Sequence, residues 1–233
     1  MGLGDTIKIT FALRKHQKGE IAEARAIYED LYSRGCISSR YLLPYSIMLL
    51  RDCKEESYHK AKEVLLKAQK AADLSENGRS ELLLNFAVAD FKLGNVEKAV
   101  ELMERVHQKY PSGNTYSTLG YLYVEEGDAE KALELNTAAL EYDDEDPIVL
   151  DNMGQTYYRL LNDKEKALEY FKKAHEIKPG QIDTLWFLSR YDLEADKKEE
   201  AIEKLETALE GRFSPLNYVT KAKIEEELKH LRG

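Results

Sequence analysis

A ten-residue phrase that occurs six times constrains the fold of this chain more than any other feature. Its fourth copy reads EGDAEKALEL and begins at residue 126. Related phrases begin at residues 18, 55, 93, 161 and 195, so successive copies lie 33–38 residues apart. A period of this length is the signature of similar structural units stacked one after another. The sequence therefore predicts a chain built from six such units.

The repeated phrase combines a turn with the start of a helix. In the fourth copy, Gly127 can end one helix in a left-handed conformation, and Asp128 can cap the free N–H groups of the next. Apolar and small residues recur at helical spacing on both sides of this turn. They are Tyr116, Leu119, Gly120 and Tyr123 before it, and Ala132, Leu135 and Ala139 after it. Each unit is therefore predicted to be a helix–turn–helix pair.

Small residues inside the predicted helices indicate how the two helices of a pair meet. Gly120 and Gly154 lie within first helices, where glycine costs about 1 kcal/mol relative to alanine. Close approach of a second helix is the usual compensation. Alanine occupies the equivalent position of all six second helices: Ala24, Ala61, Ala99, Ala132, Ala167 and Ala201. We therefore expect the helices of each pair to cross at short distance.

These residues resemble the tetratricopeptide repeat family. In the fifth unit the matching residues, with one extra residue before the alanine of the second helix, are Met153, Gly154, Tyr157, Ala167, Phe171, Ala174 and Pro179. The resemblance extends over nearly the whole chain. It implies an all-α fold, an α-solenoid in which six helix–turn–helix units form a right-handed superhelix, closed by a C-terminal capping helix.

The expected organisation is a single solenoid domain over residues 1–233. Its approximate units are 5–37, 38–79, 80–112, 113–146, 147–181 and 182–215, followed by the capping helix at 216–231. The second unit departs from the pattern because Pro44 falls inside its first helix, which predicts a kink or a late start. The capping helix is expected because a stack of helix pairs would otherwise leave an apolar face uncovered.

The resemblance also implies where a partner would bind. In this family the first helices line a concave groove, and aromatic, amide and arginine side chains suit peptide recognition. The candidate groove residues are Ser117, Tyr121, Asp151, Asn152, Gln155, Tyr158, Arg159, Trp186 and Arg190. Of the positions that form a carboxylate clamp in chaperone-binding members, only Asn152 agrees, so capture of chaperone tails is not expected. Arg159 and Arg190 remain suited to an acidic peptide, and the aromatic residues could instead pack against neighbouring units.

Composition and motifs argue against several other functions. The net charge of −9 and the scatter of Lys and Arg among acids disfavour nucleic acid as a partner. Cys36 and Cys53 form no CxxC pair, and the five histidines lie far apart, so neither a metal site nor a cofactor is expected. No phosphate-binding glycine loop or serine nucleophile motif is present. The acidic run at 141–146 is interpreted as a helix cap, with Asp146 preceding Pro147.

The first ten residues lack the layout of a secretion signal, and no apolar run is long enough to span a membrane. We therefore expect a soluble, cytoplasmic protein without direct membrane insertion, although the sequence leaves open a signal or anchor that once preceded it. The main hypothesis is a non-catalytic protein–protein interaction scaffold that binds a peptide or partner protein. The alternative is a self-assembly module that forms homo-oligomers, and an enzyme would need a chemistry without a recognisable motif.

Overall fold

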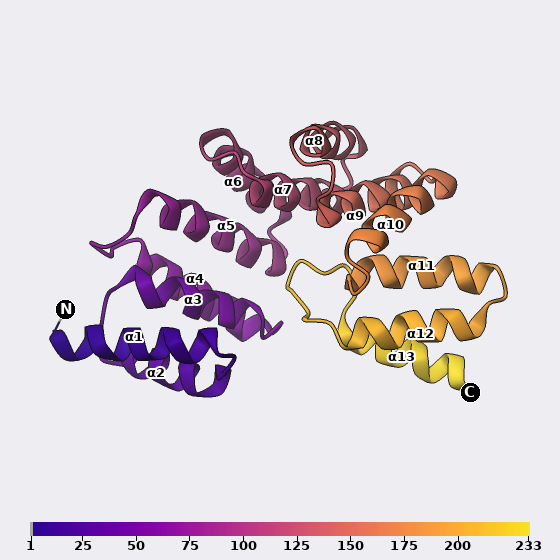
Figure 1. The fold of residues 1–233 in the computed structure, drawn as a ribbon. Helices are drawn as coiled ribbons and strands as arrows, with labels where there is room; N and C mark the ends of the chain where they lie inside the picture. The colour runs from indigo at the N-terminus through magenta and orange to yellow at the C-terminus, as the bar shows by residue number, and fades with distance from the viewer. Residues whose placement is uncertain (1) are drawn as a thin grey trace. The chain divides into compact units, whose positions relative to one another are not determined.

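The computed structural model describes residues 2–233 and is helical throughout (Figure 1). Within this range there are thirteen α-helices, one π-helical turn and no β-strand, so the predicted all-α architecture is confirmed. The elements are α1 (Leu3–Gln17), α2 (Ile21–Ser33), α3 (Ser39–Leu50), α4 (Glu55–Ala68), α5 (Glu76–Lys92), α6 (Val96–Lys109), α7 (Gly113–Glu126), α8 (Ala129–Tyr142), α9 (Pro147–Gln155), η1 (Thr156–Leu160), α10 (Lys164–Ile177), α11 (Ile182–Glu194), α12 (Lys198–Leu209) and α13 (Lys221–Arg232).

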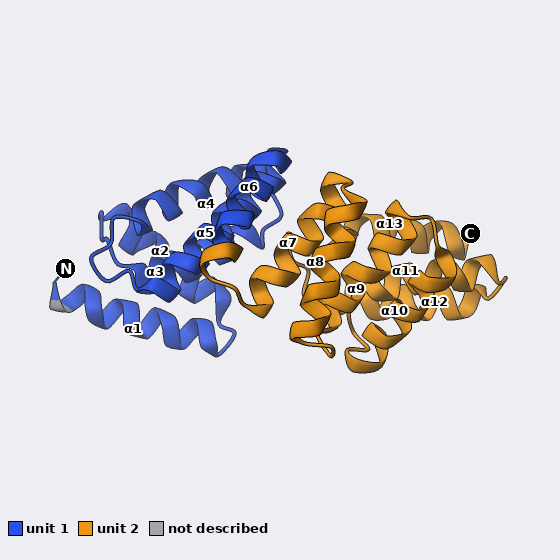
Figure 2. Ribbon diagram, turned by 90° about the horizontal axis from the view of Figure 1, so that it is seen from above, with its two compact units in different colours: residues 1–106 blue, residues 107–233 orange. Residues whose placement is uncertain are grey.

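The helices form two compact units, which Figure 2 shows in different colours. Unit 1 ends at Val106 and unit 2 spans His107–Gly233. In unit 1, α1 packs against α2 and α3 packs against α4. In unit 2 the pairs are α7 with α8, α9 with α10, and α11 with α12, and α13 packs against α12. Because α9 also contacts both α7 and α8, each pair in unit 2 provides the surface on which the next pair stacks.

The turns between paired helices use the residues that the repeated phrase predicts. Gly127 ends α7 with a φ of 86°, in the left-handed region that favours glycine. Asp128 then caps α8, since its Oδ1 accepts a hydrogen bond from the backbone N–H of Lys131 at 3.0 Å. Asp146 caps α9 in the same way, with the backbone N–H of Ile148 at 2.8 Å. The predicted caps are confirmed.

Small residues allow the paired helices to approach closely, as expected. A Cβ atom at Gly120 would lie 2.1 Å from Oδ1 of Asn136 in α8. A Cβ atom at Gly154 would lie 2.5 Å from the ring of Phe171 in α10. The six equivalent alanines of the second helices, Ala24, Ala61, Ala99, Ala132, Ala167 and Ala201, are fully buried. The glycines are therefore required by contact with the partner helix.

The second helix pair is more regular than the proline suggested. Helix α3 runs through Pro44 and begins at Ser39, so the late start offered as one outcome is wrong. Asp73, which lies after α4, stabilises this helix start. Its carboxylate accepts hydrogen bonds from the Ser39 backbone N–H at 2.8 Å and from the Ser38 hydroxyl at 2.6 Å. The extra residues after α4 thus supply a cap for α3.

The extra residue of the fifth copy is absorbed as the π-helical turn η1. In η1 the backbone N–H of Leu161 bonds to the carbonyl of Thr156 at 3.1 Å, which is five residues earlier. A single inserted residue is commonly accommodated in this way, and such turns often occur at functional sites. Two of the predicted groove residues, Tyr158 and Arg159, lie in this turn.

The last helix starts later than expected. Helix α13 begins at Lys221, whereas the sequence suggested a start near residue 216. The segment before it is held by Asp183 of α11, whose carboxylate accepts hydrogen bonds from the backbone N–H groups of Tyr218 at 3.1 Å and Val219 at 3.0 Å. Thr220 then caps α13 through the backbone N–H of Lys223. These bonds fix α13 against the preceding pair.

Candidate functional site

The nine candidate groove residues all lie in unit 2, on the first helices of its pairs. Ser117 and Tyr121 belong to α7, and the others belong to α9, η1 and α11. Six of the nine have exposed fractions of 1–7%: Ser117, Tyr121, Asp151, Asn152, Gln155 and Trp186. The remaining three, Tyr158, Arg159 and Arg190, are half-buried. Fewer of the candidate residues are therefore accessible to a partner than the sequence suggested.

Four side chains form a continuous polar chain along this face. Asp151 accepts a hydrogen bond from the Gln155 amide at 2.7 Å, and Arg159 donates to the Gln155 amide oxygen at 2.9 Å. Arg159 also forms an ion pair with Glu125 of α7 at 2.5 Å. The arginine is thus held between two helix pairs. Its orientation is fixed before any partner arrives.

The buried members of the candidate set join consecutive helix pairs. The Asn152 amide donates to the Ser117 carbonyl at 2.8 Å, across 35 residues of sequence. The Thr184 hydroxyl donates to Asp151 at 2.5 Å, across 33 residues. Because the spacing of these bonds is one repeat, they hold each first helix against the next. Contact of these buried side chains with a partner stays a prediction.

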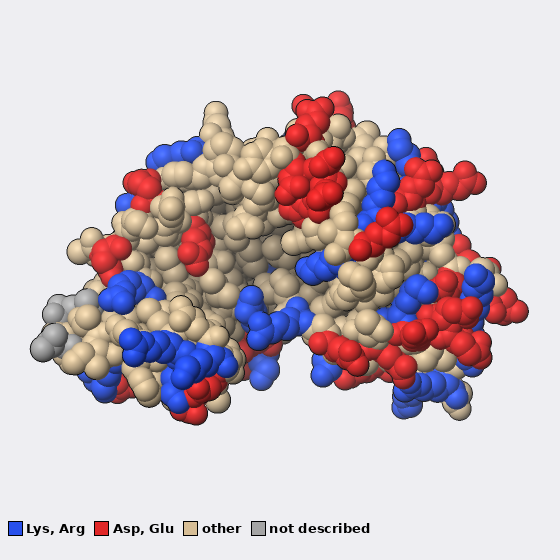
Figure 3. All heavy atoms as spheres, viewed as in Figure 1, with Lys and Arg blue, Asp and Glu red and all other residues tan. Residues whose placement is uncertain are grey.

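Two carboxyl groups, those of Asp151 and Asp183, are buried beneath this face. Burial, followed by the charge of Asp183, raises the pKa of Asp151 above the ordinary carboxyl value. Burial likewise raises the pKa of Asp183, although hydrogen bonds from Asn217, Val219 and Tyr218 oppose this. Both carboxyl groups therefore favour the protonated form more strongly than they would in the unfolded chain. Acidic side chains are also abundant on the surface of unit 2 (Figure 3).

Cations alternate with aromatic rings at the accessible edge of the face. The Arg159 guanidinium lies 4.2 Å from the centroid of the Tyr218 ring. The Lys223 ammonium lies 5.6 Å from the same ring and 4.8 Å from the ring of Trp186. The Arg190 guanidinium lies 4.8 Å from the centroid of the Trp186 ring. We call these five residues the cation–aromatic ladder.

Two carboxylates balance two of the three cations in the ladder. Glu125 pairs with Arg159, and Glu227 of α13 pairs with Arg190 at 2.8 Å. Glu227 also accepts a hydrogen bond from the indole N–H of Trp186 at 2.9 Å. Lys223 is exposed, and the described residues give it no carboxylate partner. The ladder therefore carries one unbalanced positive charge.

An aromatic layer supports the ladder from below. The rings of Phe171 and Phe187 stack with centroids 4.7 Å apart and an interplanar angle of 10°. Tyr218 also stacks on Phe187 at 5.3 Å, and Tyr158 meets Phe187 edge-on at 5.2 Å. Offset and edge-on arrangements of this kind are favourable and geometrically restrictive. Tyr158 is thereby committed to the layer while keeping part of its ring accessible.

The sequence did not predict three members of this arrangement, namely Tyr218, Lys223 and Glu227. The last helix was assigned only as a cap over an apolar face, yet it supplies Lys223 to the ladder and Glu227, which binds Trp186 and Arg190 beside it. Continuing the repeat period beyond residue 215 would have placed residues 216–232 where the first helix of a further pair belongs. That extrapolation is the signal that could have found them.

The arrangement is suited to binding rather than to an identified reaction. Among the described residues, no group of three His, Cys, Asp or Glu side chains is placed to hold a metal ion. Bilayer-spanning helices are likewise not found among them, since none combines the required length and apolar character. What the ladder offers is a fixed set of cations and aromatic faces. These groups can recognise a carboxylate together with an apolar or aromatic side chain.

Comparison with known proteins agrees with the repeat and the fold. Tetratricopeptide repeat models match residues 81–113 and residues 112–180. The chain contains tetratricopeptide repeats over residues 81–180. Among relatives, signal recognition particle subunit SRP72 of Homo sapiens is 25% identical over 205 residues, which cover 85% of this chain and 30% of that protein. This tetratricopeptide repeat chain thus spans less than a third of that relative.

Solved structures show the same fold. A tetratricopeptide repeat protein from Parabacteroides merdae matches with a TM-score of 0.79 at 14% identity, covering 99% of this chain and 85% of that one. A thermophilic member of the family from Thermus thermophilus matches with a TM-score of 0.66 at 19% identity, covering 84% and 99% respectively. The predicted tetratricopeptide α-solenoid is therefore confirmed as the fold class.

Proposed function

We propose that this chain is a non-catalytic scaffold that binds an acidic peptide of a partner protein along the cation–aromatic ladder of unit 2. The observation that carries the proposal is the unbalanced charge of Lys223. Its ammonium group lies over Trp186 and beside Tyr218, and no carboxylate of the described residues neutralises it. A partner carboxylate placed there would meet a cation already positioned by two aromatic rings.

Preorganisation supports the same function. Arg159 and Arg190 are each held by a carboxylate and by an aromatic face. A peptide that binds beside them does not have to immobilise long flexible side chains, which lowers the entropic cost of association. The human relative is by its name a subunit of a larger particle. A role for this chain in holding a partner protein is compatible with that relationship.

The sole tryptophan provides a direct test. Trp186 lies inside the ladder, so a peptide that binds there should change its fluorescence emission. The experiment titrates the protein with a set of synthetic peptides that contain acidic and aromatic residues, together with amide counterparts of the acidic ones. We expect the acidic peptides to bind and the counterparts to bind weakly, because only the former supply a carboxylate to Lys223.

Matched variants separate the ladder from general surface charge. Lys223→Glu should weaken binding at least tenfold, whereas Lys229→Glu should not, because Lys229 is exposed on the same helix but outside the ladder. Arg159→Ala should also weaken binding. Circular dichroism would confirm that each variant remains folded. Equal affinities for the protein and its Lys223→Glu variant would show that the proposal is wrong.

A further inference from the structure

One face of α1 exposes two large apolar side chains to solvent. Ile7 and Phe11 have exposed fractions of 62% and 53%, and both lie on the same side of the helix. Together with Thr6, Thr10 and Arg14 they line a shallow groove on α1 alone. The solvent-facing side of a helix is usually polar. The exposed apolar residues of this groove are therefore a candidate contact surface for another molecule.

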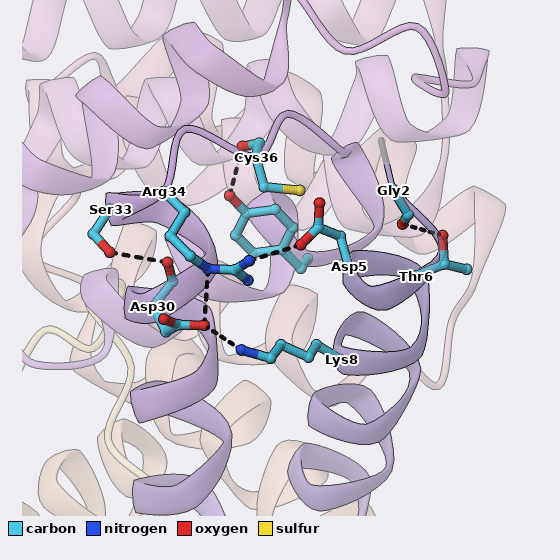
Figure 4. Close-up of polar contacts among 9 residues, drawn as sticks. Gly2, Asp5, Thr6, Lys8, Asp30, Ser33, Arg34 and Cys36 are labelled. Carbon is cyan, nitrogen blue, oxygen red and sulfur yellow. Dashed lines mark hydrogen bonds and ion pairs between the residues drawn. The ribbon is translucent and has the colours of Figure 1, made fainter.

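Loose packing of α1 does not explain the exposure. Figure 4 shows that the opposite side of the helix is tied to α2 and to the residue that follows it. Lys8 pairs with Asp30 at 3.0 Å, and Arg34 bridges Asp30 at 3.1 Å and Asp5 at 2.9 Å. Ile9 is completely buried on the inner side. The orientation of α1 is fixed, so its apolar outer groove is a permanent feature of the surface.

The same repeat positions are covered in a later helix pair. Aligning Ala12 with Gly154 places Ile7 at the position of Val149 and Phe11 at the position of Met153. Val149 and Met153 have exposed fractions of 1% and 2%, and the helix that carries them packs against both α7 and α8. The groove on α1 is thus the surface on which a preceding helix would stack.

The shape of the groove favours a helix as its occupant. Thr6, Thr10 and Arg14 form one row at four-residue spacing, and Ile7 and Phe11 form the adjacent row. The space between two such rows on an α-helix accepts a row of side chains from a second helix. Two apolar residues provide too little apolar surface to anchor the helix in a lipid membrane. They are sufficient to contact one row of apolar side chains on a second helix.

Charge indicates the composition of that helix. Arg14 lines the groove and has no ion-pair partner among the described residues, and Lys18 follows it at the exposed end of α1. Lys and Arg side chains gather over α1 in Figure 3. Unit 1 carries 17 Lys and Arg against 16 Asp and Glu, whereas unit 2 carries 17 against 27. A helix that is apolar on one side and acidic beside it would complement this surface.

The opposite end of another copy fits less well. Ile224 and Leu228 of α13 are buried, and its exposed residues are charged or small, such as Glu225 and Glu226. That helix offers no apolar ridge for Ile7 and Phe11. Pairing two α1 helices would place cationic surfaces against each other.

We propose that the groove formed by Thr6, Ile7, Thr10, Phe11 and Arg14 is a docking site for an acidic amphipathic helix of a partner protein.

The chain itself supplies a probe with the required chemistry. Helix α8, AEKALELNTAALEY, is amphipathic, carries three glutamates and one lysine, and packs on the next first helix in unit 2. A fluorescent, helix-stabilised peptide of this sequence is titrated with the full chain and followed by anisotropy. A second peptide carries Glu130→Lys, Glu134→Lys and Glu141→Lys. We expect the acidic peptide to bind at least tenfold more tightly than the basic one.

Two variants in the groove and two control variants in unit 2 test the site. Phe11→Asp should weaken binding of the acidic peptide at least tenfold, and Arg14→Glu should shift the preference towards the basic peptide. Ile177→Asp is the matched control, because Ile177 is 46% exposed on α10 in unit 2, and it should bind normally. Lys223→Glu should also bind normally, so that failure at the ladder and failure at α1 are distinguishable.

Other occupants give different results, and each of them would overturn the proposal. A concentration-dependent dimer in sedimentation that Phe11→Asp abolishes would identify the groove as an interface between copies of this chain. Phe11-dependent binding to phosphatidylglycerol vesicles without peptide binding would identify a lipid surface. Absence of binding by either peptide, or equal losses for Phe11→Asp and Ile177→Asp, would show that the groove is not a docking site for a helix.

Discussion

Replacing Gly154 by alanine tests whether contact between paired helices decides the stability of unit 2. Two opposing effects can be estimated. Alanine is favoured over glycine by about 1 kcal/mol in a helix interior. The new methyl group, however, would lie 2.5, 2.6 and 2.9 Å from three ring atoms of Phe171, about 1 Å inside the optimal carbon–carbon separation of about 3.5–4.0 Å. The outcome depends on whether the ring can move.

The ring of Phe171 has little freedom to move. It is completely buried and stacks on Phe187 at 4.7 Å. Overpacking of a core costs about 1–3 kcal/mol, and a clash with a ring held on its other face should fall in the upper part of this range. Subtracting the helix-propensity gain leaves a net destabilisation of about 1–2 kcal/mol for Gly154→Ala.

Urea unfolding followed by Trp186 fluorescence measures this difference. Trp186 is the sole tryptophan, and its ring centroid lies 4.9 Å from that of Phe187. Its fluorescence emission therefore reports on the affected core. Gly113→Ala is the matched control, because no atom lies within 4 Å of a Cβ at this position in α7, and it should be neutral or slightly stabilising. A Gly154→Ala variant as stable as the parent protein would refute the reasoning.

A second variant separates steric contact from other causes. Adding Phe171→Leu to Gly154→Ala removes the ring that meets the new methyl group, so the two changes should cost less together than the sum of their separate effects. The first helix pair provides a natural precedent. There, Ala12 and Tyr28 occupy the equivalent positions and are both completely buried. Alanine is therefore compatible with an aromatic partner when the surrounding core is adjusted to it.

Two further predictions concern single carboxylates. Burial and then the charge of Asp183 raise the pKa of Asp151, so the native state favours its protonated form. The free energy of unfolding should therefore fall as the pH rises from about 4, the ordinary Asp pKa, towards neutrality. Asp151→Asn should therefore gain stability relative to the parent protein as the pH rises, and a constant difference in urea unfolding across that range would contradict this. Asp73→Ala should cost about 1–2 kcal/mol through loss of the α3 cap, whereas Asp144→Ala, at an exposed position, should leave thermal unfolding unchanged.

The features that the sequence predicted correctly are those that depend on neighbouring residues. Gly127 and Asp128 form a turn because each acts on its own helix end. Gly120 and Gly154 indicate close contacts because the helix that meets them follows within the same pair. The repeat period then extends these local rules along the chain, which is why the helix pairs and the fold class could be predicted.

The features that the sequence missed depend on where an extra residue or a distant segment is placed. The inserted residue of the fifth copy could have lengthened the turn, but it was absorbed in η1, which carries Tyr158 and Arg159. Asp73 caps α3 only because the segment after α4 returns to the start of the same pair. Lys223 reaches the ladder because Asp183 fixes the segment before α13. None of these contacts follows from helical periodicity.

Two of the three cations of the ladder already form ion pairs within the protein, which limits how much binding free energy a partner can gain from them. If a peptide carboxylate displaced Glu125 from Arg159, one ion pair would replace another, and the net free energy gained would be small. Lys223 differs because its ammonium group faces two rings and has no carboxylate partner among the described residues. A new ion pair there adds an interaction that the free protein lacks. Binding should therefore depend more on Lys223 than on Arg159, and a stronger effect of Arg159→Ala than of Lys223→Glu would indicate that partners act by displacing the internal carboxylates.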